Sequence, residues 1–450
     1  MTDRPNVLWI TTDQQFAGAM SCAGNDYIET PAMDRLAETG TRFTNAYCTN
    51  PSCTPSRAGM LTGRMPSTAL AAADGEFVAE DYRDQTLGNL LSDAGYDCVY
   101  AGKWGGSNRD ETESDYGFTD LWGKNDLRIP EVCADFLAAE HDRPFFLSAN
   151  FDNPHNICEW SRDYTPPWGM VDDVQPEEYP PLPPNHAIPP YEPKAVRDFL
   201  ERSRYWSAME GATPTEWREY RHAYYRLIEQ ADAGIGRILD ALEAEGLADD
   251  TLVIFTADHG DGHGAHQLIQ KILLYEEMVR VPFIVRAPDR TNAGETCSEL
   301  ISSGLDLLPT ICEYADVDPP GDLRGRSLRP LLTGDAPSDW REYVVTETVG
   351  PNRDGRMVRT DRYKYVVYHE GRHNEQLTDL AADPGEMVNL AKNASHADVL
   401  QAHRDRLLAW CHEMDDAFGA RYHQDVPMIP GYSFQELWPQ FIEEPPGAPR

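Results

Sequence analysis

Three short apolar runs, each followed by polar residues, constrain the fold of this chain more than any other feature. They are residues 6–12, 144–150 and 251–257. Runs of this kind are typical of strands that are buried on both faces of a parallel sheet. Open α/β sheets bind their ligands at the carboxyl ends of the strands. We therefore expect Asp13, His155 and Asp258, which follow the three runs, to lie at one edge of a sheet.

The rest of the pattern indicates an α/β protein with a smaller second part. Apolar residues recur at helical spacing over residues 213–246, and helix start and stop signals bound residues 31–40. From about residue 341 the pattern changes to short strands, followed by a helix near residues 396–414. We expect a large α/β domain at residues 1–335 and a C-terminal subdomain at residues 336–450. The subdomain should hold a short antiparallel sheet, a helix and an extended tail.

Composition excludes several classes of protein. The net charge of −36 argues against binding of nucleic acid, whose phosphates need cationic partners. No apolar run approaches the ~18 residues of a membrane span, and the first residues lack the layout of a signal peptide. We therefore expect a cytoplasmic protein. Its nine cysteines are scattered and odd in number, which does not suggest a disulfide framework.

One cysteine has an unusual setting. Cys53 precedes a helix-like run, residues 56–61, and Arg57 follows it closely. A helix N-terminus offers free N–H groups and partial positive charge, which suits an anion, and arginine adds a permanent cation. The alternative is a structural cysteine, because cysteine is among the most buried residue types.

Several separated motifs together resemble those of one enzyme family. They are Cys53-Thr-Pro-Ser-Arg57 with Leu61-Thr-Gly-Arg64, Gly95 to Trp104, Pro154-His155, Asp258-His259-Gly260, and Lys271 followed by Arg280-Val-Pro282. In this order they resemble the signatures of the type I sulfatases of the alkaline phosphatase superfamily. The resemblance implies an alkaline phosphatase-like fold, in which helices sandwich a large mixed, mostly parallel sheet.

The resemblance also implies a mechanism. In that family a maturation enzyme oxidises the motif cysteine, here Cys53, to formylglycine. One hydroxyl of the hydrated aldehyde would attack sulfur, and the other would expel sulfate and regenerate the aldehyde. This is covalent catalysis that divides one difficult step into two easier ones.

The same resemblance assigns residues to roles. The implied catalytic residues are Cys53, Arg57, Lys103, His155 and Lys271. Lys103, His155, Lys271 and His266 are implied to contact the substrate. Asp13, Gln14, Asp258 and His259 are implied to bind a divalent cation. Oxygen ligands favour Ca²⁺, with Mg²⁺ or Mn²⁺ as alternatives.

Two positions depart from the family pattern and keep other functions open. Gln14 stands where the family has a second acid, and Gly105 stands where it commonly has a histidine. The Asp13-Gln14 pair also resembles the pairing of phosphonate monoester and phosphodiester hydrolases, so that activity is an alternative. A non-catalytic metal-binding protein with an unmodified Cys53 is a third.

The substrate is less constrained than the reaction. Residues 160–195 form a long insertion rich in proline, acidic and aromatic residues, and such loops are often functional. We expect this insertion to form a wall of the substrate pocket. A sulfated carbohydrate would suit a polar, aromatic wall, and an aryl sulfate is the other option.

Overall fold

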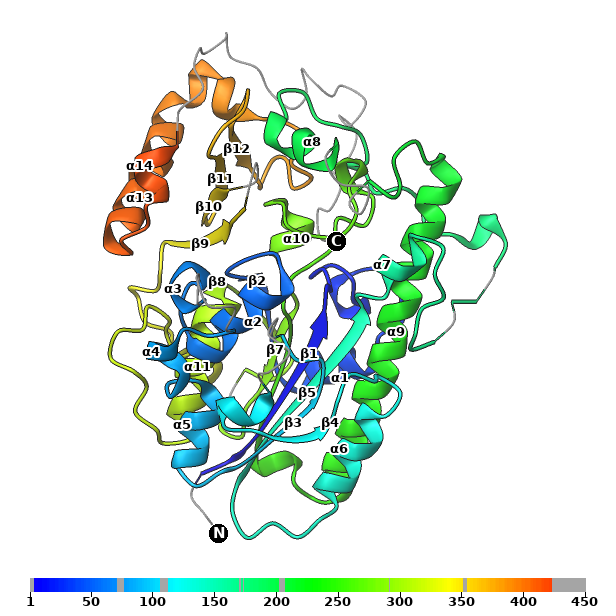
Figure 1. Ribbon diagram of the computed structural model, residues 1–450, viewed down its shortest axis with the longest axis vertical. Coiled ribbons are helices and arrows are strands. Elements are labelled where there is room, and N and C mark those ends of the chain that lie inside the picture. The colour runs from blue at the N-terminus through cyan, green and yellow to red at the C-terminus, as the bar shows by residue number, and fades with distance from the viewer. Residues whose placement is uncertain are drawn as a thin grey trace.

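The protein is described here by a computed structural model that covers residues 4–70, 77–105, 112–169, 171–172, 174–201, 207–290, 292–350 and 354–422. The tail expected near the C-terminus lies outside these residues. Figure 1 shows a large sheet flanked by helices and a small sheet, with helices α13 and α14 beside it, at one end of the molecule.

Eight strands of the described chain form the large sheet, in the order β4-β3-β5-β1-β6-β7-β2-β8. Neighbouring strands run parallel except at β6–β7 and β7–β2, which are antiparallel. The strands are β1 (Asn6–Asp13), β2 (Thr41–Tyr47), β3 (Asp97–Gly102), β4 (Thr119–Trp122), β5 (Phe145–Pro154), β6 (Thr251–Ala257), β7 (Phe283–Arg286) and β8 (Glu295–Ser302). This confirms the expected mixed, mostly parallel sheet.

Helices cover both faces of this sheet. One core forms between the sheet and α1, α6 and α9, and a second core forms between the sheet and α2, α5 and α11. The helices are α1 (Pro31–Thr39), α2 (Cys53–Thr62), α3 (Pro66–Ala69), α4 (Glu80–Arg83), α5 (Leu87–Asp93), α6 (Ile129–Leu137), α7 (Ile157–Trp160), α8 (Lys194–Glu201), α9 (Pro214–Ala244), α10 (Glu276–Val279), α11 (Ser303–Tyr314), α12 (Arg329–Thr333), α13 (Ala397–Glu413) and α14 (Phe418–Arg421). Short 3₁₀ helices lie at Ser21–Ala23, Glu113–Tyr116, Pro176–Glu178, Ala248–Asp250, Ala265–Gln267, Leu390–Lys392 and Ala394–His396.

The longest helix, α9, begins and packs as its sequence predicts. Thr213 accepts a hydrogen bond from the backbone of Glu216 at 3.3 Å, and Pro214 occupies the first helical position. Proline is favoured there because it has no N–H to leave unsatisfied. Apolar residues such as Leu227, Ile235 and Ile238 are fully buried against the sheet.

The small sheet is antiparallel throughout and has its own apolar core with α13. Its strands are β9 (Tyr343–Thr348), β10 (Gly355–Thr360), β11 (Tyr363–Tyr368) and β12 (Glu375–Asp379). Figure 1 shows α13 beside this sheet. The expected boundary at residues 335/336 falls between α12 and β9, and the division into two domains stays a prediction.

The register of the central strands gathers polar residues at one edge. Strand β1 lies between β5 and β6, with Thr11 opposite Asn150 and Thr12 opposite Ala257. Asp13 and Asp258 follow those positions, so their carboxylates come from adjacent strand ends. No helix among the described residues has both the length and the apolar character needed to cross a membrane.

Candidate active site

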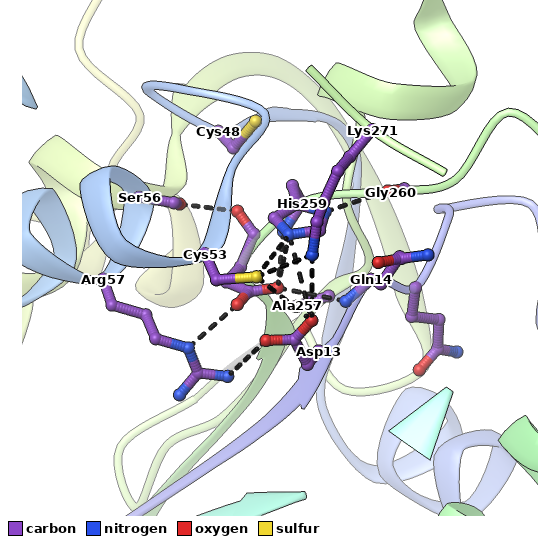
Figure 2. Close-up of polar contacts among 12 residues, drawn as sticks. Asp13, Gln14, Cys48, Cys53, Ser56, Arg57, Ala257, His259, Gly260 and Lys271 are labelled. Carbon is purple, nitrogen blue, oxygen red and sulfur yellow. Dashed lines mark hydrogen bonds and ion pairs between the residues drawn. The ribbon is translucent and has the colours of Figure 1, made fainter. Parts of the chain in front are cut away.

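The structure places Cys53 at the first position of helix α2. The preceding residue, Ser52, is extended, and the helix begins at Cys53 rather than at Ser56 as expected. Lys271 Nζ donates a hydrogen bond to Cys53 Sγ at 2.8 Å, and His259 Nε2 lies 3.3 Å from the same sulfur. Asp13 Oδ1 is 3.5 Å away. Figure 2 shows the sulfur directed toward these three side chains.

The environment of Cys53 differs from that of an inert cysteine. Burial and the Asp13 carboxylate raise its pKa, but Lys271, Lys103 and His259 outweigh them and the pKa is lowered overall. The nearby Cys48 is fully buried, and burial raises its pKa. Reactive cysteines are found in electropositive, partly accessible settings. Cys48 therefore has the environment of a buried structural cysteine, whereas Cys53 has that of a reactive cysteine in a functional site.

A group of potential metal ligands surrounds this sulfur. Ligand atoms of Asp13, Asp258, His259 and Cys53 all lie within 4.8 Å of one another. Asp13, Asp258 and His259 are fully buried. The backbone oxygen of Gly260 lies 2.9 Å from His259 Nδ1, which leaves Nε2 facing the sulfur. Two buried carboxylates with an imidazole are a donor set that fits a divalent cation.

Gln14 adjoins this group, but its side chain has other partners. Its backbone N–H donates to Asp258 Oδ1 at 3.1 Å. Its amide nitrogen donates to Asp261 Oδ2 at 2.7 Å and contacts Cys158 Sγ at 3.5 Å. The structure therefore brings together three of the four predicted metal ligands, and a role for the Gln14 amide as the fourth stays a prediction.

Arg57 contacts this group of potential metal ligands and is almost fully buried. Its Nε donates to Asp258 Oδ2 at 2.8 Å, and its Nη2 lies 3.5 Å from Asp13 Oδ2. Another nitrogen, Nη1, contacts Asn150 Oδ1 at 3.3 Å. These contacts fix the guanidinium against both carboxylates.

Lys103 reaches the site from the end of strand β3. Gly102 has a φ of 102°, and an added Cβ would lie 1.9 Å from the backbone oxygen of Asn150. Only glycine tolerates this backbone, which turns the chain and directs Lys103 inward. Lys103 Nζ lies 2.7 Å from Asp13 Oδ2 and 3.1 Å from Asp152 Oδ1. Burial alone would lower its pKa, but Asp13 raises the pKa well above its usual value.

His155 follows strand β5 and is partly buried beside the lysines. Its Nδ1 has no hydrogen-bond partner among the described residues. Burial lowers the pKa of His155, and Lys271 and Lys103 lower it further, so the imidazole is neutral at physiological pH. A neutral imidazole with one nitrogen unpaired in the described part of the chain keeps hydrogen-bonding capacity for a ligand.

The structure does not bring His266 to Cys53. Its ring stacks on Tyr275 at a centroid distance of 4.1 Å, and its Nε2 lies 3.4 Å from Asn185 Nδ2. His263 contacts Arg221 instead, with Nδ1 at 2.8 Å from the guanidinium. The three histidines of this segment therefore have separate partners, and only His259 contacts the nucleophile position. These contacts among the described residues do not test the predicted role of His266 in substrate binding, which stays a prediction.

Sequence reasoning missed an ionic network beside Lys103. One oxygen of the fully buried Asp152, Oδ1, forms ion pairs with Lys103 Nζ at 3.1 Å and Lys124 Nζ at 2.9 Å. Its other oxygen accepts the indole N–H of Trp168 at 3.1 Å. Trp168 belongs to the insertion that was expected to wall the pocket. The signal that could have revealed Lys124 is the scarcity of lysine, since the chain has only six.

The space beside Gly105 explains one departure from the family pattern. A Cβ at this position would lie 2.7 Å from Cδ and 2.9 Å from Cβ of Arg57, and 3.1 Å from the ring of Phe77. Contacts this short require a neighbour to move. Arg57 is held by Asp258, so a side chain at position 105 would disturb the site.

The fold and this site together define a class of enzyme. A mostly parallel sheet carries two acids, a histidine, two lysines and an arginine around one cysteine, as in hydrolases of the alkaline phosphatase superfamily. The chain belongs to the sulfatase family, since residues 5–317 match the family described as Sulfatase. Residues 264–413 also match N-sulphoglucosamine sulphohydrolase, C-terminal. The protein is therefore a sulfuric ester hydrolase.

Comparisons with individual proteins agree with this assignment. The chain is 31% identical over 425 residues to a Delta 4,5-hexuronate-2-O-sulfatase of Bacteroides thetaiotaomicron, covering 89% of this chain and 88% of the other. Its structure resembles that of a 2-O GAG sulfatase with a TM-score of 0.84 and 29% identity, over 94% and 95% of the two chains. It also shares the fold of the phosphonate monoester hydrolase of Agrobacterium radiobacter, with a TM-score of 0.72 at 22% identity over 91% and 96%.

Proposed function

We propose that this enzyme hydrolyses a sulfate ester of a sulfated carbohydrate, through a formylglycine formed from Cys53. One observation carries the proposal. Cys53 Sγ lies within 3.5 Å of a lysine, a histidine and an aspartate that come from three different parts of the chain. A structural cysteine has no need of such partners, whereas a nucleophile needs cations around the charge that develops on it.

The residues present divide the work of a sulfuryl transfer. Lys103 and Lys271 neutralise negative charge on the transferring group, and Arg57 holds the two carboxylates in place. His155 is neutral, its Nδ1 has no hydrogen-bond partner within the described part of the chain, and it is available to the leaving oxygen. Asp13, Asp258 and His259 would hold a divalent cation, which supplies Lewis-acid polarisation when bound. Ca²⁺ suits the carboxylates best, and Mg²⁺ or Mn²⁺ are the alternatives.

Two observations favour a sugar as the leaving group. The relatives described above act on hexuronate and on GAG chains, as their names state. In addition, the indole N–H of Trp168 in the insertion donates a hydrogen bond to Asp152, which forms an ion pair with Lys103. An aromatic ring at this position suits the apolar face of a sugar ring. The cytoplasmic location and the maturation enzyme stay predictions.

A phosphonate monoester or phosphodiester hydrolase is the second candidate. It is favoured by the amide of Gln14 where the sulfatase pattern has an acid, because the metal site then carries less negative charge. The shared fold with a phosphonate monoester hydrolase adds no argument about substrate. An aryl sulfate is a further option for the sulfatase itself.

Parallel assays separate these candidates. The purified enzyme should be given a sulfated monosaccharide, an aryl sulfate and an aryl phosphodiester under one set of conditions, and kcat/KM compared. The proposal predicts the highest value for the sulfated sugar. Preference for the phosphodiester would overturn it, and preference for the aryl sulfate would remove the carbohydrate assignment alone.

A further inference from the structure

Lys124 is a cation at the active site that the proposed chemistry does not use. It lies in the bend that follows strand β4, and its side chain is 48% exposed. Its Nζ lies 2.9 Å from Asp152 Oδ1, the same oxygen that Lys103 Nζ contacts at 3.1 Å. Two ammonium groups therefore meet at one carboxylate oxygen, one directed into the site and one open to solvent.

Lys124 also acts on the residue expected to meet the leaving group. Burial, Lys271 and Lys103 lower the pKa of His155, and Lys124 contributes to the same shift. Its charge is therefore felt on the side of the site where the leaving group departs. Because Lys103 and Lys124 pair with the same oxygen of Asp152, a substrate group bound at Lys103 lies close to Lys124.

The balance of charge suggests an anion as its ligand. Among the described residues in this network, Arg57, Lys103, Lys124 and Lys271 oppose Asp13, Asp152 and Asp258. These ion pairs join four cations to three carboxylates, an excess of one positive charge that equals the charge of a sulfate monoester, and a bound divalent cation would add two more positive charges for a second anion to meet. This excess is local, because the chain as a whole carries a charge of −36. Three of its six lysines lie here.

We propose that Lys124 determines specificity by binding a second anionic group of the sugar substrate, a carboxylate or a further sulfate, on the leaving-group side of the scissile ester. The proposal rests on the proposed function of the same site. The ammonium remains paired with Asp152 in the free enzyme and turns to the substrate when its anion arrives. Trp168, bonded to the other oxygen of Asp152, keeps that carboxylate in place as Lys124 changes partner.

The test compares three substrates in kcat/KM. They are a neutral monosaccharide with one sulfate, the same ring with two sulfates, and a hexuronic acid with one sulfate. Lys124→Gln should reduce the preference for a doubly charged substrate over the singly charged one by about 10-fold or more, mainly through KM. A charge-assisted hydrogen bond is typically worth this much. The doubly charged substrate that loses most identifies the second group as carboxylate or sulfate.

Two further variants distinguish specificity from positioning. Lys194→Gln removes another exposed lysine that is paired with an aspartate, Asp198, and should leave the preference unchanged. Asp152→Asn should lower kcat on all three substrates by a similar factor, because it loosens Lys103. If Lys124→Gln also lowers all three equally, or none, the inference is wrong. If the wild-type enzyme releases sulfate from no sugar, the proposed function fails and this inference with it.

Discussion

Lys271 donates a hydrogen bond to the sulfur of Cys53 at 2.8 Å across 218 residues of chain. The contact joins a loop that follows strand β6 to the first turn of helix α2. Asp13 lies 3.5 Å from the same sulfur and 3.9 Å from Lys271 Nζ. A thiol enclosed in this way occupies the centre of the site, where the reacting group of a sulfatase must be.

Replacement of Cys53 tests this position. Cys53→Ala should reduce kcat by at least about 10³-fold, because loss of a nucleophile removes the covalent route. The free energy of unfolding should change by less than about 1 kcal/mol, since Cys53 is only partly buried. Cys48→Ala is the matched control, and it should cost about 1 kcal/mol of stability but retain activity. Equal activity in the two variants would contradict the assignment.

Asp258 should be essential for metal binding. Asp258→Ala removes a buried carboxylate that also holds Arg57 at 2.8 Å, so the cation loses a ligand and the site loses its alignment. Elemental analysis of the purified variant should find no bound divalent metal, and activity should fall with it. Asp232→Asn is a control, because Asp232 is a buried acid that accepts backbone N–H groups of helix α1 instead. Normal metal content in Asp258→Ala would mean that the ligand set is wrong.

Gly105 should tolerate no side chain. Gly105→Ala places a Cβ within 3 Å of Arg57, and such overpacking typically costs about 1–3 kcal/mol. We expect a lower melting temperature and a lower kcat, because the guanidinium must shift. Gly321→Ala is the control, since a Cβ there meets nothing within 4 Å. Full stability and activity in Gly105→Ala would show that Arg57 is not confined as described.

Asp126 should make stability depend on pH. Burial and the neighbouring Asp152 raise its pKa from 3.8 to about 7. Between these values the folded state binds more protons than the unfolded state, so the free energy of unfolding falls as pH rises. Asp126→Asn should remove this dependence, which amounts to at most about 1.4 kcal/mol of unfolding free energy per pH unit. Urea unfolding from pH 4.5 to 7.5 should show the wild type losing stability relative to the variant. Parallel curves for the two proteins would contradict the prediction.

The sequence predicted those parts of the site that lie on strand ends. Asp13, Lys103 and Asp258 follow apolar runs, and adjacent parallel strands bring their carboxyl ends together. Lys124 and Asp152 were missed as a pair because the contact depends on how β3, β4 and β5 lie side by side, which no spacing along the chain records. Strand β7 and its antiparallel pairing were also missed, because a strand of four residues carries little periodic pattern.

The role of His266 in substrate binding stays a prediction, and the local backbone decides where its side chain lies. Its backbone is left-handed, with a φ of 53°, and so is that of His263, with a φ of 29°. These turns send the side chains of the histidine-rich segment in different directions. The motif resemblance could assign His266 a role, but its stacking on Tyr275 depends on local geometry that composition does not encode.

The central claim is that Cys53 becomes formylglycine, and the mass of one tryptic peptide tests it most directly. The peptide from Phe43 to Arg57 contains two cysteines, Cys48 and Cys53. Protein from its native host should be denatured, reduced and alkylated before digestion. We predict one alkylated cysteine, at residue 48, and an aldehyde or its hydrate at residue 53. Two alkylated cysteines in fully active enzyme would contradict the account.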